Sequence, residues 1–109
     1  MATDPDRVTF ILDQAAGAGR LEARKMFGEY ALYCDGKLSA LICDGALFVK
    51  ETPGVVPLVA EPVRAPPYPG AKPQLRIEAE LDDPDLLARI IRAAAKDAPE
   101  PKPKKPKGR

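Results

Sequence analysis

The stretch KMFGEYALYCDGKLSALICDGALFVK, residues 25–50, contains the tripeptide Cys-Asp-Gly twice, with the two copies nine residues apart. Asp-Gly readily adopts the positive backbone φ angles that a two-residue hairpin turn requires. Residues typical of β-strands flank both copies. The stretch therefore predicts three consecutive antiparallel strands, at about 25–33, 38–42 and 46–50.

The two turns also fix an expected register for these strands. It sets Tyr33 opposite Leu38 and Ile42 opposite Leu47, and it sets Ala31 opposite Ala40. Side chains alternate between the two faces of a strand, so each face receives its own set of residues.

The first face of the expected meander is apolar, and of the two faces it is the one that we expect to form the core beneath the helices. It carries Phe27, Ala31, Tyr33, Leu38, Ala40, Ile42, Leu47 and Val49. The second face carries Met26, Tyr30, Leu32, Leu41, Cys43 and Phe48, with Ser39 and Lys50 as its polar members. This second face is too apolar for a plain solvent face, so we expect either the segment 52–73 or a partner to cover it.

Further elements follow from helix and strand signals outside the meander. Asp4-Pro5 is typical of a helix start, which predicts a helix over 5–16. The segment 52–61 is weakly helical, and 74–81 alternates like a half-buried strand. Asp83-Pro84 predicts the start of a final helix that ends before Pro99.

Composition and charge indicate one small domain with a basic tail. The chain has 109 residues, of which 45% are hydrophobic. We expect a folded domain over 1–98, followed by a disordered Lys/Pro-rich tail over 99–109 whose five basic residues against Glu100 give a net charge of +4. The chain has no run of about 18 apolar residues and no signal-like N-terminus, so a cytoplasmic protein without membrane contact is expected.

The sequence offers little catalytic chemistry. It contains no histidine, the commonest general base and metal ligand, and only two cysteines. Cys34 and Cys43 fall at opposite ends of the middle strand, roughly 20 Å apart at about 3.3 Å per residue, which predicts two reduced thiols. Asp35 and Asp44 are separated in the same way and are interpreted as turn formers. We therefore expect no catalytic residue, no cofactor and no metal site, and hence no enzyme.

Residues 24–36 and 40–50 resemble the TfoX N-terminal domain family, which comprises the N-terminal domain of Sxy/TfoX-type bacterial competence regulators and their single-domain relatives. The resemblance covers roughly 4–96. It implies a two-layer α+β fold in the order α-β-β-β-α-β-β-α, a three-strand meander plus two later strands packed with N- and C-terminal helices. Within it, Pro62–Tyr68 would supply a strand that the residues alone do not indicate.

The resemblance also implies a function without catalysis, in regulation of transcription and competence. Full-length competence regulators carry a second, C-terminal domain, and this chain ends in a short basic tail instead, so only the N-terminal module carries over. We therefore expect a protein-interaction module that docks to itself or to a transcription-related partner. The expected interaction surface consists of Met26, Tyr30, Leu32, Leu41 and Phe48.

The alternative hypothesis is a nucleic-acid-associated accessory protein that binds weakly through its basic residues. The expected phosphate contacts are Arg20, Arg24, Lys25, Lys102, Lys104, Lys105 and Lys107. Such binding falls steeply with salt, which separates it from protein docking. A small enzyme or ligand binder is a third and less favoured hypothesis.

Overall fold

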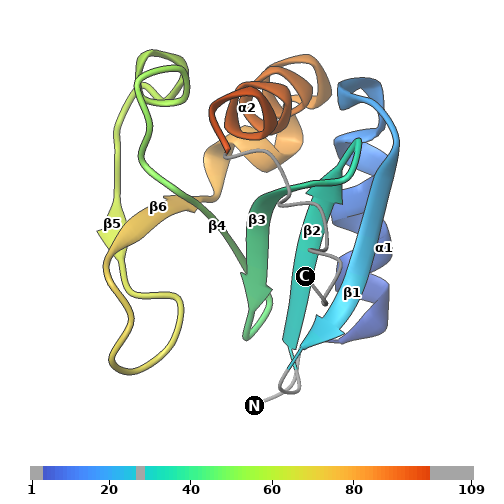
Figure 1. The fold of residues 1–109 in the computed structure, drawn as a ribbon, viewed down its shortest axis with the longest axis horizontal. Coiled ribbons are helices and arrows are strands. Elements are labelled where there is room, and N and C mark those ends of the chain that lie inside the picture. The colour runs from blue at the N-terminus through green and yellow to red at the C-terminus, as the bar shows by residue number, and fades with distance from the viewer. Residues whose placement is uncertain (1–3, 27–28, 99–109) are drawn as a thin grey trace, which may run out of the picture.

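The computed structural model describes residues 4–26 and 29–98. Within these ranges, six strands form one antiparallel sheet in the order β1-β2-β3-β4-β6-β5. Figure 1 shows α1 behind the sheet and α2 across the end at which β3 begins. Two helices on one sheet make a two-layer α+β fold, as expected from the sequence.

The elements run in the following order. They are α1 (Pro5–Gln14), η1 (Ala16–Ala18), β1 (Leu21–Met26), β2 (Glu29–Cys34), β3 (Lys37–Cys43), β4 (Ala46–Val49), η2 (Val56–Leu58), β5 (Arg64–Ala65), β6 (Gln74–Ile77), η3 (Ala79–Asp82) and α2 (Pro84–Asp97), where η denotes a 3-10 turn.

Both α-helices begin where the sequence predicts. The Asp4 carboxylate accepts a hydrogen bond from the Asp6 N–H at 2.9 Å, and the Asp83 carboxylate accepts one from the Leu86 N–H at 3.1 Å. A proline follows each capping residue. These bonds satisfy backbone donors that the first helical turn leaves without a partner.

Both Asp-Gly pairs form the expected turns. The φ angles are 52° and 85° at Asp35 and Gly36, and 51° and 79° at Asp44 and Gly45. Positive φ at both central residues is the signature of a type I′ hairpin turn. The assignment of both aspartates as turn formers is therefore confirmed.

The expected strand over 25–33 is wrong, because this stretch belongs to two strands. β1 ends at Met26 and β2 begins at Glu29, and the two strands pair antiparallel from Leu21↔Cys34 to Met26↔Glu29. Phe27 and Gly28 lie outside the described residues. Residues 21–24 are part of β1, and their alternation of Leu and Ala with Glu and Arg is the period-two pattern of a strand.

A β-bulge in β3 also overturns part of the expected register. Tyr33 pairs with Leu38, but Leu32 pairs with Ala40, so Ser39 has no partner residue in β2. Ala31 therefore lies opposite Leu41 and not opposite Ala40. The pairs Tyr33↔Leu38 and Ile42↔Leu47 are confirmed.

The bulge exchanges the faces that were assigned to β2. Because one extra residue inverts the alternation, Leu32 and Tyr30 face the helices together with Ala40 and Ile42. Tyr33 and Leu38 then lie on the face away from the helices. The expected division of the meander into two faces is correct for β4 and for the second half of β3, and wrong for β2 and Leu38.

One continuous core lies between the helices and the sheet. Its largest fully buried side chains are Ile11, Leu32, Ile42, Leu47, Leu75, Ile77, Leu87, Ile90 and Ile91. On the opposite face, Phe48 is only 5% exposed and Cys43 only 6%, whereas Leu38 is 47% exposed. The chain itself thus covers part of the second face and leaves the part around Leu38 open.

The remaining segments are shorter than expected. The weakly helical segment 52–61 contains only η2, with Pro57 inside it. The strand implied by the resemblance at 62–68 is present as the two-residue β5, and the strand expected over 74–81 ends at Ile77, where η3 soon follows. Among the described residues, no helix has the length and apolar character needed to cross a membrane.

Candidate functional site

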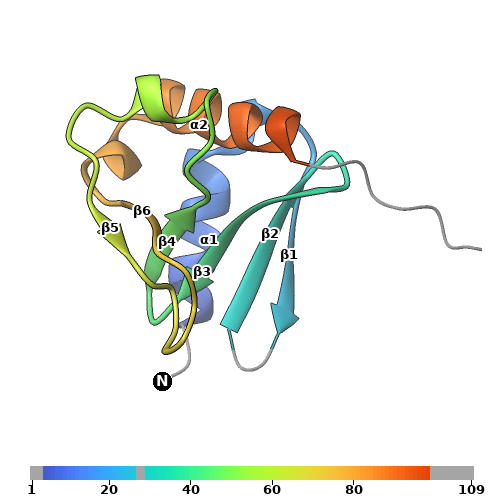
Figure 2. The same cartoon turned by 60° about the vertical axis from the view of Figure 1, so that its left-hand side comes forward.

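The sheet splits between its two central strands. β3 and β4 pair only at Leu41↔Phe48, Ile42↔Leu47 and Cys43↔Ala46. In the first half of β3, residues 38–40 lie beside β2 on one side and pair with no described strand on the other. Figures 1 and 2 show β4 diverging from β3 along this half. One backbone edge of residues 38–40 is therefore open in the middle of the sheet.

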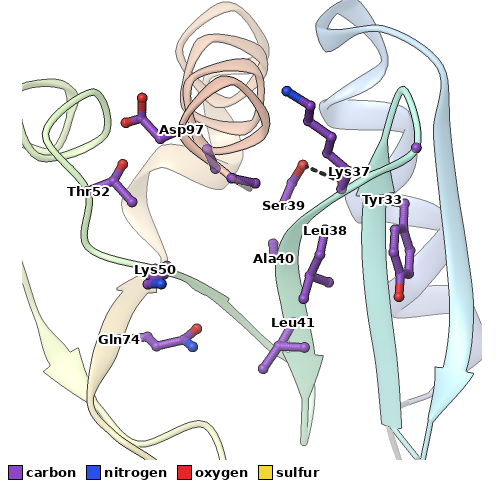
Figure 3. A pocket seen from close by; sticks show the side chains of 13 residues that line it. Tyr33, Lys37, Leu38, Ser39, Ala40, Leu41, Lys50, Thr52, Gln74 and Asp97 are labelled. Carbon is purple, nitrogen blue, oxygen red and sulfur yellow. Dashed lines mark hydrogen bonds between the residues drawn. The ribbon is translucent and has the colours of Figure 1, made fainter. Parts of the chain in front are cut away.

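A pocket of about 510 Å³ fills this split (Figure 3). We call it the β3–β4 cleft. Leu38 and Leu41 of β3 line it. Lys50, directly after β4, Gln74 of β6 and Asp97 in the last turn of α2 complete the walls. Its size lies within the range of about 300–1,000 Å³ that is typical of binding sites, and its lining is mainly apolar.

The bulge at Ser39 explains why the cleft forms. A bulged strand bends and twists more strongly than a regular one, so β3 turns away from β4 at this point. Ser39 is only 4% exposed, and its hydroxyl donates to the Lys37 carbonyl at 3.1 Å. The hydroxyl is therefore satisfied locally within the bulge.

A hydrogen bond to the end of α2 holds one wall of the cleft. The Asp97 carboxylate accepts the Gly54 N–H at 2.8 Å. The Thr52 hydroxyl beside the carboxylate and the Gly54 N–H both lower the pKa of Asp97. The Thr52 hydroxyl is nevertheless buried without a partner at hydrogen-bond geometry, so we assign only the Gly54 bond. A buried polar atom without a partner is uncommon in folded proteins.

Positive charge predominates around the cleft. A second hollow of about 200 Å³ adjoins it at the β2–β3 turn, and both hollows share Lys37. Together their charged lining residues are the cations Lys37, Lys50, Arg92 and Lys96 and the acids Asp35 and Asp97. Both acids already accept backbone hydrogen bonds, Asp35 from the Arg20 N–H at 3.0 Å and Asp97 from Gly54. Four positively charged side chains thus line the two hollows, together with two carboxylates that already accept backbone hydrogen bonds.

The structure divides the expected interaction surface between both faces of the sheet. Leu41 and Phe48 are cross-strand partners on the open face, and Leu41 lines the cleft. Met26 is 39% exposed at the end of β1. Leu32 is fully buried in the core, and Tyr30 packs against that core from the edge. The expected alignment of all five residues on one face is therefore wrong, because the bulge inverts β2.

The expected phosphate contacts do not converge in the described part of the chain. Arg24 forms an ion pair with Glu22 at 3.3 Å and lies over the Tyr33 ring, 4.8 Å from its centroid. Lys25 follows it in β1 and so points to the other face. Arg20 precedes β1, and Lys102, Lys104, Lys105 and Lys107 lie outside the described residues.

Most of the cleft could not be found from the sequence. Thr52, Gln74 and Asp97 come from three segments whose approach depends on the tertiary fold. The available signal was the presence of Ser39 and Lys50 as polar members of an otherwise apolar strand face. Both residues line the cleft.

The two cysteines are free and buried, as expected for reduced thiols. Burial raises the pKa of both, and the charge of Asp35 raises that of Cys34 further. The Cys34 thiol lies 3.6 Å from the Ala18 carbonyl oxygen, which accepts its hydrogen bond. No group of three His, Cys, Asp or Glu residues suited to a metal ion occurs within 4–26 and 29–98.

Comparison with known proteins places this fold in a family. Residues 13–98 match the family model of the TfoX N-terminal domain. The chain belongs to the TfoX N-terminal domain family. This regulatory, non-catalytic family is the one that the motif over 24–50 indicates, and the match spans every described residue of the cleft.

A relative of similar length supports the same assignment. It is an uncharacterized 12.7 kDa protein in the trpE 5′ region of Spirochaeta aurantia, 36% identical over 107 residues. The alignment covers 98% of this chain and 93% of the relative. The relative thus resembles this chain over nearly the whole length of both proteins.

Proposed function

We propose that this chain is a non-enzymatic protein-interaction module with a regulatory role, and that a partner protein docks at the β3–β4 cleft. The observation that carries the proposal is the open backbone edge of residues 38–40 beside an apolar-lined pocket. Membership of a regulatory, non-catalytic domain family supports the regulatory role.

Exposed apolar surface favours this location over the rest of the second face. Leu38 is 47% exposed at the mouth of the cleft, whereas Phe48 is almost completely covered by the chain itself. A docking partner gains most from burying apolar side chains that the free protein leaves in water. The cleft is therefore the best-supported docking site on this face.

Site-specific photo-crosslinking tests docking at the cleft. Leu38→p-benzoylphenylalanine is introduced into the full chain, expressed in its native host and irradiated. Phe10→p-benzoylphenylalanine is the matched control, because Phe10 is 38% exposed on α1 and does not line the cleft. We expect one partner protein to be crosslinked from position 38 and not from position 10, and nuclease treatment should not change this result. Equal crosslinking from both positions, or none from position 38, contradicts the proposal.

The regulatory role is tested by transcript profiling. Leu38→Asp places a charge at the mouth of the cleft without disturbing the buried core. We expect a strain with this variant to show the same transcript changes as a strain that lacks the protein, while Phe10→Asp behaves like wild type. Wild-type transcript levels in the Leu38→Asp strain would contradict a regulatory function of the cleft.

A further inference from the structure

The chemistry of the cleft also indicates what binds there, provided that docking occurs there as proposed above. We propose that the occupant is an extended, acidic segment of a partner protein, which joins the sheet as an added strand along residues 38–40. Its backbone pairs with the open edge of β3, its apolar side chains cover Leu38 and Leu41, and its carboxylates lie near the surrounding cations.

The first argument is the contrast between this internal edge and the two outer edges of the sheet. Outer edges are protected against pairing by charges, prolines or short length. β1 carries three charged residues out of six, and β5 is only two residues long and is followed by Pro66 and Pro67. Beyond Lys37, the open edge of β3 carries no charge and no proline, and its one protective feature is the bulge at Ser39. It is therefore the edge best suited to strand addition.

The second argument is the lining of the cleft beneath that edge. Leu38 pairs with Tyr33 across the bulge, and both line the cleft beside Leu41. An added strand points every second side chain toward this lining and the alternate ones away from it. The occupant should therefore have apolar residues at alternate positions, each covering surface that Leu38 now exposes.

The third argument is charge. Four cations and two carboxylates surround the cleft and its adjoining hollow, and both carboxylates already accept backbone hydrogen bonds. Among the described residues, no carboxylate lies within ion-pair distance of Lys50. An acidic segment complements this site.

The chain's own tail is a poor match for the same edge. The tail 99–109 follows Ala98, which lines the cleft, and it carries the same net sign of charge as the cleft. Four of its eleven residues are proline, which has no N–H to donate to a strand ladder. Its positive charge instead adds to the attraction of an acidic partner.

A displayed peptide library tests the chemistry of the occupant. Random linear nine-residue peptides are selected on the full chain and counter-selected on the full-length Leu38→Asp variant, whose folding is checked by circular dichroism. Enriched peptides are then measured by fluorescence anisotropy. We expect the enriched peptides to contain alternating apolar and acidic residues. They should bind the Lys50→Glu variant about tenfold more weakly than wild type, because this substitution replaces one close attractive charge pair by a repulsive one. Lys72→Glu, an exposed lysine outside the cleft lining, is the control and should bind like wild type.

Hydrogen exchange separates strand addition from contact through side chains alone. An added strand gives new hydrogen-bond partners to backbone groups of residues 38–40, so exchange of amides in this segment should slow when the peptide binds. A copy of the same peptide that is N-methylated at alternate residues cannot pair and should bind at least tenfold more weakly. Unchanged exchange, or equal binding of the methylated peptide, overturns strand addition.

The remaining outcomes separate this inference from the proposed function. Enriched peptides that depend on Leu38 but are neutral or basic overturn the acidic occupant and leave docking at the cleft intact. If no peptide distinguishes wild type from Leu38→Asp while crosslinking from position 38 succeeds, the occupant is not a linear segment and this inference fails alone. A dimer in sedimentation velocity that Leu38→Asp dissociates identifies a second copy as the occupant and likewise overturns it.

Discussion

The Asp97 carboxylate accepts the Gly54 N–H at 2.8 Å, which joins the last residue of α2 to a loop 43 positions earlier in the chain. The bond holds the segment after β4 against the helix, on the side of the cleft opposite β3. A Cβ atom added at Gly54 would lie only 2.7 Å from the same carboxylate oxygen. A residue without a side chain therefore suits this position.

The lowered pKa of Asp97 predicts a pH dependence of stability that Asp97→Asn removes. Because the folded state lowers the pKa of Asp97, the carboxylate stabilises the fold at pH values above its ordinary pKa, and this contribution is lost as the pH falls through the lowered value. We expect wild type to unfold at higher urea concentration than Asp97→Asn near neutral pH, with the difference disappearing in acid.

Asp13→Asn is the control for this measurement, because Asp13 is exposed on α1. Its urea midpoint should follow that of wild type at every pH. A difference between wild type and Asp97→Asn that persists unchanged at the acid end would show that the charge of Asp97 does not contribute.

The inverted faces of β2 predict unequal costs for two leucine truncations. Leu32 is fully buried between sheet and helices, so Leu32→Ala should lower the free energy of unfolding by about 3 kcal/mol. Leu38 is 47% exposed, so Leu38→Ala should cost less than about 1 kcal/mol. Urea unfolding followed by circular dichroism measures both. Equal costs, or a larger cost at Leu38, would contradict the bulged register.

The sequence predicted the local elements well and the register less well, for a physical reason. The Asp-Gly turns and both helix starts, each a capping Asp followed by Pro, depend on residues within a few positions of each other, so the sequence shows them directly. The bulge at Ser39 has no such signal. A single extra residue inverts every side chain beyond it, and one missed bulge therefore placed Leu32 on the wrong face.

The candidate site was less predictable than the fold, because its parts meet only in three dimensions. Lys37 and Leu38 belong to a strand that the sequence identifies, but Thr52, Gln74 and Asp97 reach the same cleft from separate segments. The cleft exists because two neighbouring strands stop pairing after Leu41↔Phe48. A strand pattern shows where a strand runs and leaves unspecified where it parts from its neighbour.

The positive φ of Gly36 predicts that a side chain at this position destabilises the fold through backbone strain and not through steric overlap. Its φ is +85°, and an added Cβ would meet nothing within 4 Å. Gly36→Ala should therefore destabilise by about 1 kcal/mol through the backbone alone. Gly17→Ala is the matched control, since its Cβ would meet Ala88 at an ordinary 3.5 Å. Thermal unfolding should show a lower midpoint for Gly36→Ala and little change for Gly17→Ala.

The N-cap of α2 predicts a graded loss of stability in two variants of Asp83. The Asp83 carboxylate accepts the Leu86 N–H, so Asp83→Ala should cost about 1 kcal/mol in the free energy of unfolding. Asp83→Ser keeps an oxygen acceptor and should retain most of that stability. Urea unfolding at neutral pH ranks the three proteins, and an Asp83→Ala variant as stable as wild type would exclude a contribution from the cap.

The positions of the two buried thiols make it possible to detect local opening of the contact between α2 and η1. Arg92 donates to the carbonyl oxygens of Gly17 and Ala18 at 2.8 and 3.4 Å, and the Cys34 thiol donates to the same Ala18 carbonyl. Cys43 lies on the other side of the sheet, away from both helices. Opening of α2 from η1 should therefore expose Cys34 and leave Cys43 covered.

Thiol labelling with Ellman's reagent measures this opening in single-cysteine variants. Burial raises the pKa of both thiols, so both should react slowly in the native protein and rapidly in urea. Arg92→Ala should then accelerate the labelling of Cys34 severalfold and leave the labelling of Cys43 unchanged. The reason is that the hydrogen bonds lost in this variant join α2 only to η1, beside Cys34. Equal acceleration at both thiols would mean that Arg92 stabilises the whole domain rather than this contact, since global unfolding exposes both cysteines together.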